Sequence, residues 1–156
     1  MRVTLQAESQ ECGLACLVMV AAAHGLHLDL ATLRRRFSIS IKGTNLAQLM
    51  RYAQVLEFSC RPLRLELDEL CKLRTPCILH WNLNHFVVLE KVRGDRLVIL
   101  DPATGRKVIT LDEASRHFTG VALELTPNAA FRPAQEKPRL RLRDLTGRVL
   151  GLKRAL

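Results

Sequence analysis

The chain has 156 residues, of which 48% are hydrophobic and 25% charged, and this size and composition fit one globular domain with a hydrophobic core. No apolar run reaches the roughly 18–20 residues of a membrane-spanning helix, and five cysteines without a Cys-x-x-Cys pair argue against a disulfide framework. The net charge of +9 is concentrated in residues 127–156, which carry +6 of it, so the charge does not indicate a nucleic-acid partner.

Helical patterns occupy the first part of the chain. Apolar residues at helical spacing predict a first helix over residues 11–24. Asp29 is expected to cap a short second helix that runs through Phe37, and we interpret the basic run 34–36 in it as a solvated face. Thr44 is the predicted N-cap of a third amphipathic helix.

Short β-rich runs dominate the second part, after an extended stretch at 58–63 and a short helix at 67–73. The runs are separated by turn-forming residues, and we expect them at 77–81, 85–89, 97–100, 108–110 and 121–125, with a helical turn at 111–117. Helices followed by an antiparallel sheet indicate an α+β domain over residues 1–126. Three prolines mark residues 127–156 as a basic linker.

Cys12 is the candidate nucleophile. It lies where the first helix begins, and both the helix dipole and the unpaired N–H groups of the first turn favour a thiolate there. The polar residues 9–11 before it argue against deep burial, whereas Cys16 lies between apolar residues and suits the core. A buried structural thiol is the alternative for Cys12. The other cysteines have no metal-binding spacing with histidine and are interpreted as core thiols: Cys60, Cys71 and Cys77.

His85 is the candidate partner of this thiolate, because it opens a predicted strand after a polar loop. His80 lies inside a strand and is expected to pack in or beside the pocket. If the three residues 93–95 close a hairpin, Val87 faces Asp101, and His85 and Asp101 become diagonal neighbours within side-chain reach. A two-residue loop would place Asp101 on the opposite face. The alternative role of Asp101, opening an Asp-Pro turn, is compatible with the first.

Gln6 completes the set of candidate residues. A tetrahedral intermediate at a peptide carbonyl carries an oxyanion, which a side-chain amide and the backbone N–H of the nucleophile can hold together. A glutamine shortly upstream of the cysteine is well placed for this role. Taken alone, Gln6 would be interpreted as a surface residue.

Three motifs together resemble the bacteriocin-processing cysteine peptidase domain at the N-terminus of peptidase-containing ABC transporters. The motifs are Gln6 with ECGLACL at 11–17, NHFVVL at 84–89, and Asp101-Pro102-Ala103 followed by Gly105. The resemblance covers about residues 3–126 and is strongest to the colicin V transporter type of Gram-negative bacteria. It implies a papain-like fold and the removal of double-glycine leader peptides during export.

The resemblance also implies a role for each candidate residue. Cys12 is the nucleophile, and His85 is the general base and acid. Asp101 orients His85, and Gln6 is the oxyanion-hole donor. The thiolate attacks the carbonyl after the second glycine, and a pair of residues without side chains suits a narrow cleft.

The amphipathic helix of a leader is expected to dock in a shallow apolar groove. The residues proposed to line this groove are apolar and follow the first motif: Leu46, Leu49, Met50 and Trp81. Filling the core is the alternative for each of them. No cofactor, metal ion or P-loop nucleotide site is expected in this domain.

By the same resemblance, the partners are a precursor peptide with a Gly-Gly leader and the transmembrane and ATPase domains of the same transporter. The chain is then a cytoplasmic domain of an inner-membrane transporter, and it ends where a first transmembrane helix would approach. The basic, leucine-containing stretch 139–154 is expected to lie along the anionic membrane surface, with a disordered tail as the alternative in isolation.

Two other functions are compatible with parts of this pattern. The first is a non-catalytic substrate-docking domain of a type I secretion ABC transporter, in which a degenerate copy of the fold lacks the nucleophile. The presence of Cys12, His85 and Asp101 argues against it. The second is another Cys-His-Asp acyl transferase, such as a small transglutaminase, which the triad alone does not exclude.

Overall fold

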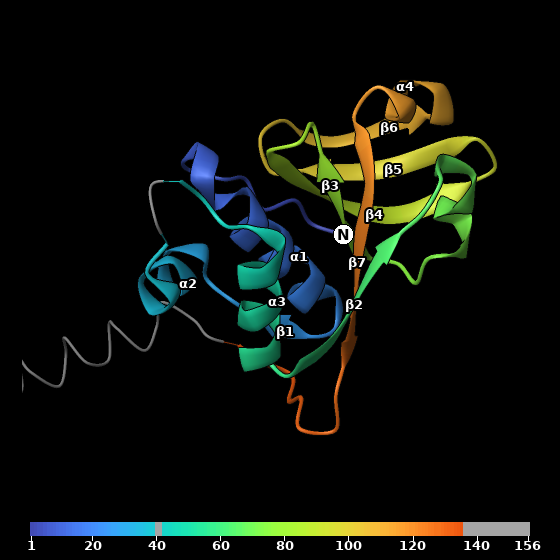
Figure 1. The fold of residues 1–156 in the computed structure, drawn as a ribbon. Helices are drawn as coiled ribbons and strands as arrows, with labels where there is room; N and C mark the ends of the chain where they lie inside the picture. Colours follow the sequence, from blue (N-terminus) through green and yellow to red (C-terminus); the bar gives the residue numbers. More distant parts are fainter. Residues whose placement is uncertain (40–41, 136–156) are drawn as a thin grey trace, which may run out of the picture.

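The computed structural model describes residues 1–39 and 42–135, and it confirms the predicted α+β class (Figure 1). The α-helices are α1 (Cys12–Ala23), α2 (Leu30–Phe37), α3 (Leu46–Val55) and α4 (Leu111–Ser115). Two short 3-10 helices, η1 (Ser9–Glu11) and η2 (Leu67–Lys72), complete the helical elements of the described residues.

The strands are β1 (Leu26–His27), β2 (Phe58–Arg64), β3 (Cys77–Trp81), β4 (His85–Arg93), β5 (Arg96–Asp101), β6 (Gly105–Thr110), β7 (Phe118–Pro127) and β8 (Ala134–Gln135). Six of them form one sheet in the order β2-β7-β3-β4-β5-β6, with antiparallel neighbours throughout. β1 and β8 form a separate parallel pair.

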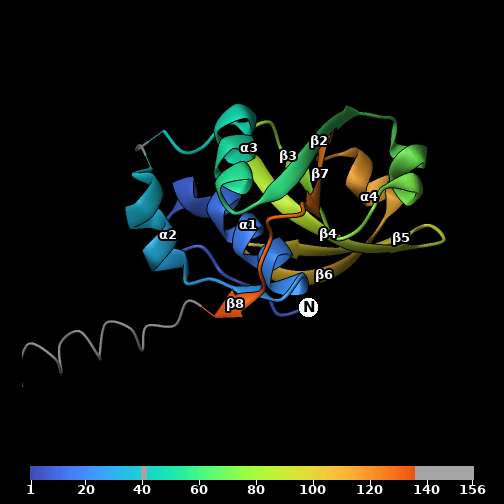
Figure 2. The same ribbon diagram turned by 90° about the horizontal axis from the view of Figure 1, so that it is seen from below.

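Helix α1 is the centre of the helical layer. Figure 2 shows it between the sheet and the other two large helices, and every residue from Cys12 to Ala21 is buried. A helix that is apolar on all sides needs such a position, because no face of it is suited to water. Cys12, the first residue of α1, is therefore part of a helix that is buried along most of its length.

The sheet buries apolar residues on both faces. Along β4, Phe86 and Val88 belong to the core cluster that contains α1, whereas Val87 and Leu89 belong to a second cluster. Successive side chains of a strand point to opposite faces, which explains this division. η2 and α4 lie over the second cluster, so both faces of β4 are covered.

Two of the predicted helix caps can be compared with the structure. Asp29 accepts a hydrogen bond from the Thr32 backbone N–H, which confirms it as the cap of α2. The predicted cap at Thr44 is wrong by one residue, because Asn45 caps α3 and accepts from the Gln48 N–H at 2.8 Å. The Gln48 side chain accepts from the Asn45 N–H in return, and this reciprocal pair fixes the start of the helix.

The β4–β5 hairpin differs from its prediction in a way that leaves the site intact. Arg93 pairs with Arg96, so the loop has two residues instead of three. A register shift between Leu89 and Lys91 adds one residue back, and Val88 pairs with Leu100. Beyond this bulge the register is the predicted one, in which Val87 lies opposite Asp101.

The packed part of the chain continues past residue 126. β8 pairs with β1, and the Phe131 ring packs against Phe58 with 4.9 Å between ring centroids. Residues 127–135 therefore contact the domain, whereas the rest of the predicted linker, 136–156, with its basic stretch, lies outside the described residues. Within the described residues, no helix is long and apolar enough to cross a membrane.

Candidate active site

Cys12 is the first residue of α1, as predicted, and its side chain is only 5% exposed. It is thus more enclosed than the polar residues before it suggest. Cys12 nevertheless lines a cavity of about 190 Å³. Ser9, Gln10 and Asn84 line the same cavity, which therefore opens next to the candidate nucleophile.

A buried carboxylate holds the turn that leads into Cys12. The Glu11 side chain is 1% exposed, and its Oε2 accepts hydrogen bonds from the backbone N–H groups of Ala7, at 2.9 Å, and Glu8, at 3.2 Å. Its Oε1 forms an ion pair with the Arg34 guanidinium of α2. The interpretation of residues 34–36 as a solvated face therefore holds only in part for Arg34, whose side chain is 42% exposed but whose guanidinium pairs with the buried Glu11.

His85 and Asp101 meet as predicted. The His85 Nε2–H donates to Asp101 Oδ1 at 2.7 Å, which leaves Nδ1 to face the thiol. Hydrogen bonds with the side chains of Asp101 and Cys12 raise the pKa of His85 to about 9, although burial opposes this shift. The imidazole therefore favours its protonated form next to the thiol, as an imidazolium–thiolate pair requires.

Asp101 is held from several sides. Its Oδ1 also accepts from the Ala103 backbone N–H at 2.8 Å, and its Oδ2 lies 3.3 Å from Lys107 Nζ of β6. Burial alone would raise the pKa of Asp101. The hydrogen bonds from His85, Ala103 and Lys107 and the charge of His85 outweigh that effect, so the pKa lies well below its usual range. Asp101 is consequently an ionised, oriented partner for the imidazole.

The other cysteines differ from Cys12 in their surroundings. Cys16 is fully buried, and burial, followed by the negative charges of Cys12 and Asp101, raises the pKa of its thiol well above the usual value. Cys77 is buried and Cys60 half-buried, as core thiols would be. The prediction is wrong for Cys71, whose side chain is exposed on η2.

Gln6 lies beside the triad. Its backbone N–H donates to the Pro102 carbonyl at 2.9 Å, which places residue 6 next to the segment that follows Asp101. The Gln6 Oε1 is buried without a hydrogen-bond partner. The Gln6 side chain thus has an unused acceptor oxygen, next to the segment that follows Asp101.

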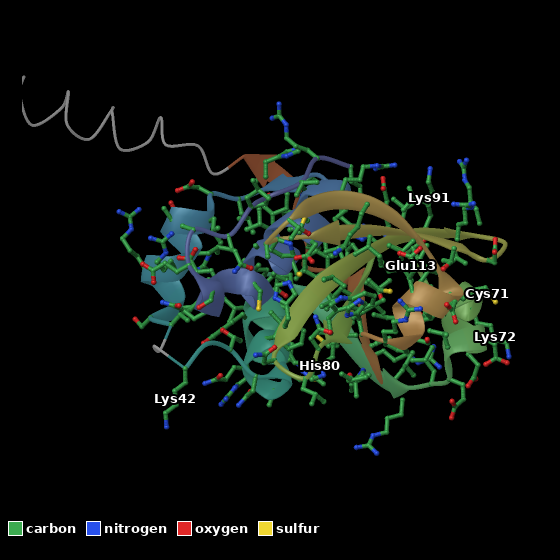
Figure 3. The ribbon with its side chains drawn as sticks, turned by 90° about the horizontal axis from the view of Figure 1, so that it is seen from above. Lys42, Cys71, Lys72, His80, Lys91 and Glu113 are labelled. Carbon is green, nitrogen blue, oxygen red and sulfur yellow. The ribbon has the colours of Figure 1, made fainter. Side chains whose placement is uncertain are left out.

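A larger cavity of about 570 Å³ continues from the one at Cys12, because the two share Lys42, Gly43, Thr44 and Asn84. Its apolar lining comes from Leu46, Leu83, Phe86 and Val121. His80 also lines it, as expected of a residue in or beside the pocket. His80 and Lys42 both lie near the lower edge of the molecule in Figure 3.

Only one of the four predicted groove residues lines this cavity, namely Leu46. Leu49 and Trp81 are buried in the two core clusters, which is the alternative that the sequence left open. Met50 is half-buried and packs against the first cluster. A helical stripe does not show which of its residues face a neighbouring helix and which face solvent.

Several residues of the site were not predicted. Lys107 is one of them. It lies in β6, which pairs with the strand that ends at Asp101, so its place after the Asp-Pro turn could have indicated that it lies near Asp101. Thr44 is another, because it lines the cavity at Cys12 although the sequence predicted only a capping role for it.

No group of three or more potential metal ligands occurs in the part of the chain that the structure describes.

Comparison with known proteins identifies the family. The model of the Peptidase C39 family matches residues 1–130. The probable microcin-H47 secretion/processing ATP-binding protein of Escherichia coli is 47% identical over 151 residues, which are 97% of this chain and 22% of that protein. The colicin V secretion/processing ATP-binding protein of Escherichia coli is 48% identical over the same shares. The chain thus spans about a fifth of the length of these curated relatives.

Solved structures agree with this match. A double glycine motif protease from an AMS/PCAT transporter, crystallised with the leader peptide, is 37% identical with a TM-score of 0.76, over 81% of this chain and 91% of that one. The peptidase domain of Streptococcus ComA is 25% identical with a TM-score of 0.75, over 81% and 98%. These matches confirm the papain-like fold. Since the family model covers most of its length, the chain belongs to the peptidase C39 family.

Proposed function

We propose that this chain is a cysteine endopeptidase that removes double-glycine leaders from bacteriocin-like precursor peptides during export. The observation that carries the proposal is the 2.7 Å hydrogen bond between His85 and Asp101, with Cys12 at the N-terminus of α1 close enough to help raise the pKa of the same imidazole. Family membership supports it, as does the solved double glycine motif protease with its leader peptide. The names of the relatives from Escherichia coli combine secretion and processing.

The mechanism follows from these contacts. The Cys12 thiolate attacks the carbonyl carbon of the second glycine, and the oxyanion that forms accepts hydrogen bonds from the Cys12 backbone N–H and the Gln6 amide. His85 protonates the leaving amine, and a thioester remains on Cys12. Neutral His85 then takes a proton from water, which attacks the thioester and releases the leader carboxylate. Asp101 orients the imidazole throughout.

No cofactor is required in this scheme. The thiolate supplies the nucleophile, and the imidazole supplies and removes the proton, so every step uses side chains of the chain itself. The larger cavity with Leu46, Leu83 and Phe86 is proposed to receive apolar residues of the leader.

The partners are proposed from the relatives. The chain spans about a fifth of each, and both are named ATP-binding proteins of secretion, so we place it beside the transmembrane and ATPase domains of an ABC transporter on the cytoplasmic side of the inner membrane. The proposed contact of residues 139–154 with the membrane surface concerns residues outside the described part of the chain.

The direct test is incubation with a precursor peptide that carries a Gly-Gly leader, followed by mass spectrometry of the products. We expect one cut after the second glycine, no cut with Cys12→Ala, and a loss of turnover with His85→Ala in a chain that still folds and unfolds cooperatively. Cleavage that survives Cys12→Ala would contradict the proposal. Specific binding of the leader without cleavage would favour the docking function, and transfer of the acyl group to an added amine in place of water would favour the transferase.

A further inference from the structure

Two buried polar atoms without partners belong to residues of the candidate site. Among the described residues, the buried side-chain atoms that lack a hydrogen bond are Gln6 Oε1, Glu11 Oε1, Arg34 Nε and Thr44 Oγ1. The second and third face each other in an ion pair. The unexplained atoms therefore belong to Gln6 and Thr44, and both residues lie at the site. A buried hydroxyl without a partner is costly and calls for an explanation.

Thr44 lies where the two cavities meet. It lines the cavity of about 190 Å³ that contains Cys12 and also the cavity of about 570 Å³ with the apolar lining. Its Cβ lies 3.6 Å from where a Cβ on Gly13 would be, in the first turn of α1 and directly after Cys12. Thr44 is therefore one of the residues that a peptide extending from one cavity into the other would pass.

Gly43 lies next to Thr44 and packs against the turn before Cys12. Gly43 has a φ of +85°, and a Cβ on it would lie 3.5 Å from the Gln10 Cα. Main chain of the 42–44 segment thus lies close to the turn before Cys12. An extended glycine pair exposes its own N–H and C=O groups, and these are the partners that a lone hydroxyl lacks.

We propose that Thr44 is a substrate-binding residue, whose buried hydroxyl rotates toward the cavity and hydrogen-bonds with the backbone of the glycine pair when the peptide binds. This inference rests on the proposed function and deepens it. Thr44 would hold the residues before the scissile bond while Leu46 and Phe86 contact the apolar part of the leader. The requirement for glycine then has a physical source, because a Cβ would separate the peptide backbone from the hydroxyl.

The test measures binding without turnover. In a Cys12→Ala background, the dissociation constant of a leader that ends in Gly-Gly is measured by calorimetry with Thr44, Thr44→Val and Thr44→Ser. A second peptide, truncated before the glycine pair, is the matched probe. Thr126→Val, which makes the same change in β7 at a residue that lines neither cavity, is the matched variant.

We expect Thr44→Val to weaken binding of the Gly-Gly peptide about three- to tenfold, the range for one uncharged hydrogen bond, and to leave binding of the truncated peptide unchanged. Thr44→Ser should restore most of the affinity, and Thr126→Val should not change it. Unchanged affinity in Thr44→Val, or an equal loss for both peptides, would overturn the inference.

Cleavage by the otherwise unaltered chain separates this inference from the proposed function. If that chain cleaves the precursor and Thr44→Val binds the leader normally, only the inference fails. If neither cleavage nor leader binding occurs with Thr44 in place, both fail. Cooperative thermal unfolding of the Thr44 variants, at temperatures no lower than that of the original chain, excludes misfolding as the cause of any difference.

Discussion

At the scale of single residues, the ionisation of His85 connects the structure to the chemistry. Asp101 accepts from the imidazole, and Lys107 and the Ala103 N–H hold Asp101 in turn. The pKa of His85 is raised to about 9, and its hydrogen bond with Asp101 is the largest cause. The pair therefore stabilises the fold fully below the ordinary pKa of histidine and loses this contribution as the pH rises through about 9.

The pH profile of kcat/KM tests this connection. Activity should fall on the alkaline side with an apparent pKa near 9, as the imidazolium loses its proton. In Asp101→Asn the negative charge is lost while the Lys107 charge remains, so the imidazolium is less stable. We expect the alkaline limb to move about one unit or more toward lower pH, measured by peptide cleavage in overlapping buffers.

Asp101→Glu is the matched control, because it keeps the charge and changes the geometry. It should reduce kcat and leave the alkaline limb nearer to that of the original chain than Asp101→Asn does. An alkaline limb that is identical in the original chain and Asp101→Asn would show that Asp101 does not set the ionisation of His85.

At the scale of elements, α2 is linked to the turn that carries the nucleophile. Arg34 of α2 pairs with Glu11, which binds the backbone N–H groups of Ala7 and Glu8. Gln6 precedes this turn and Cys12 follows it. One carboxylate therefore joins the segment with the proposed oxyanion donor, the start of α1 and the neighbouring helix.

Loss of this ion pair should be measurable as stability. Arg34→Gln leaves the buried Glu11 carboxylate without its cation, and we expect the free energy of unfolding to fall by about 1–2 kcal/mol in urea titrations, since partial exposure of Arg34 weakens the pair. Arg35→Gln removes the same charge from an exposed position of α2 and should have little effect. Equal losses in both variants would assign the effect to net charge.

Local sequence patterns predict the helices of this fold better than the pairing of its strands. The spacing of apolar residues predicts α1 well, and Asp29 identifies the start of α2. The hairpin loop is wrong by one residue, and a bulge near Glu90 restores the pairing of Val88 with Leu100. A bulge depends on pairing between strands, and the sequence of one strand does not reveal it.

At the scale of the whole molecule, the triad and the α+β class follow from the sequence, whereas the groove mostly does not. Cys12, His85 and Asp101 have chemical types that restrict their roles, and a helix start and strand ends place them. Leu49 and Trp81 are apolar wherever they lie, and only the packing of helices on the two faces of the sheet shows that they are core residues. Thr44 could be found only from its missing partner in three dimensions.

Cys71 is the internal control for the most direct measurement, which is alkylation of Cys12. Figure 3 shows Lys42, which lines the cavity at Cys12, and Cys71 at opposite ends of the molecule. Cys71 is the exposed thiol of η2, whereas Cys12 is buried at the candidate site. An ordinary alkylating reagent should therefore reach Cys71 more easily, and a reagent guided by the leader should not.

That measurement is alkylation by a leader peptide that ends in a Gly-Gly chloromethyl ketone, followed by peptide mapping of the five cysteines. The predicted result is one adduct per chain on Cys12, formed faster than any adduct on Cys71 and suppressed by excess unmodified leader. Modification of Cys71 at an equal or higher rate, or an adduct on Cys12 that a scrambled leader forms equally well, would contradict the assignment of this site to double-glycine cleavage.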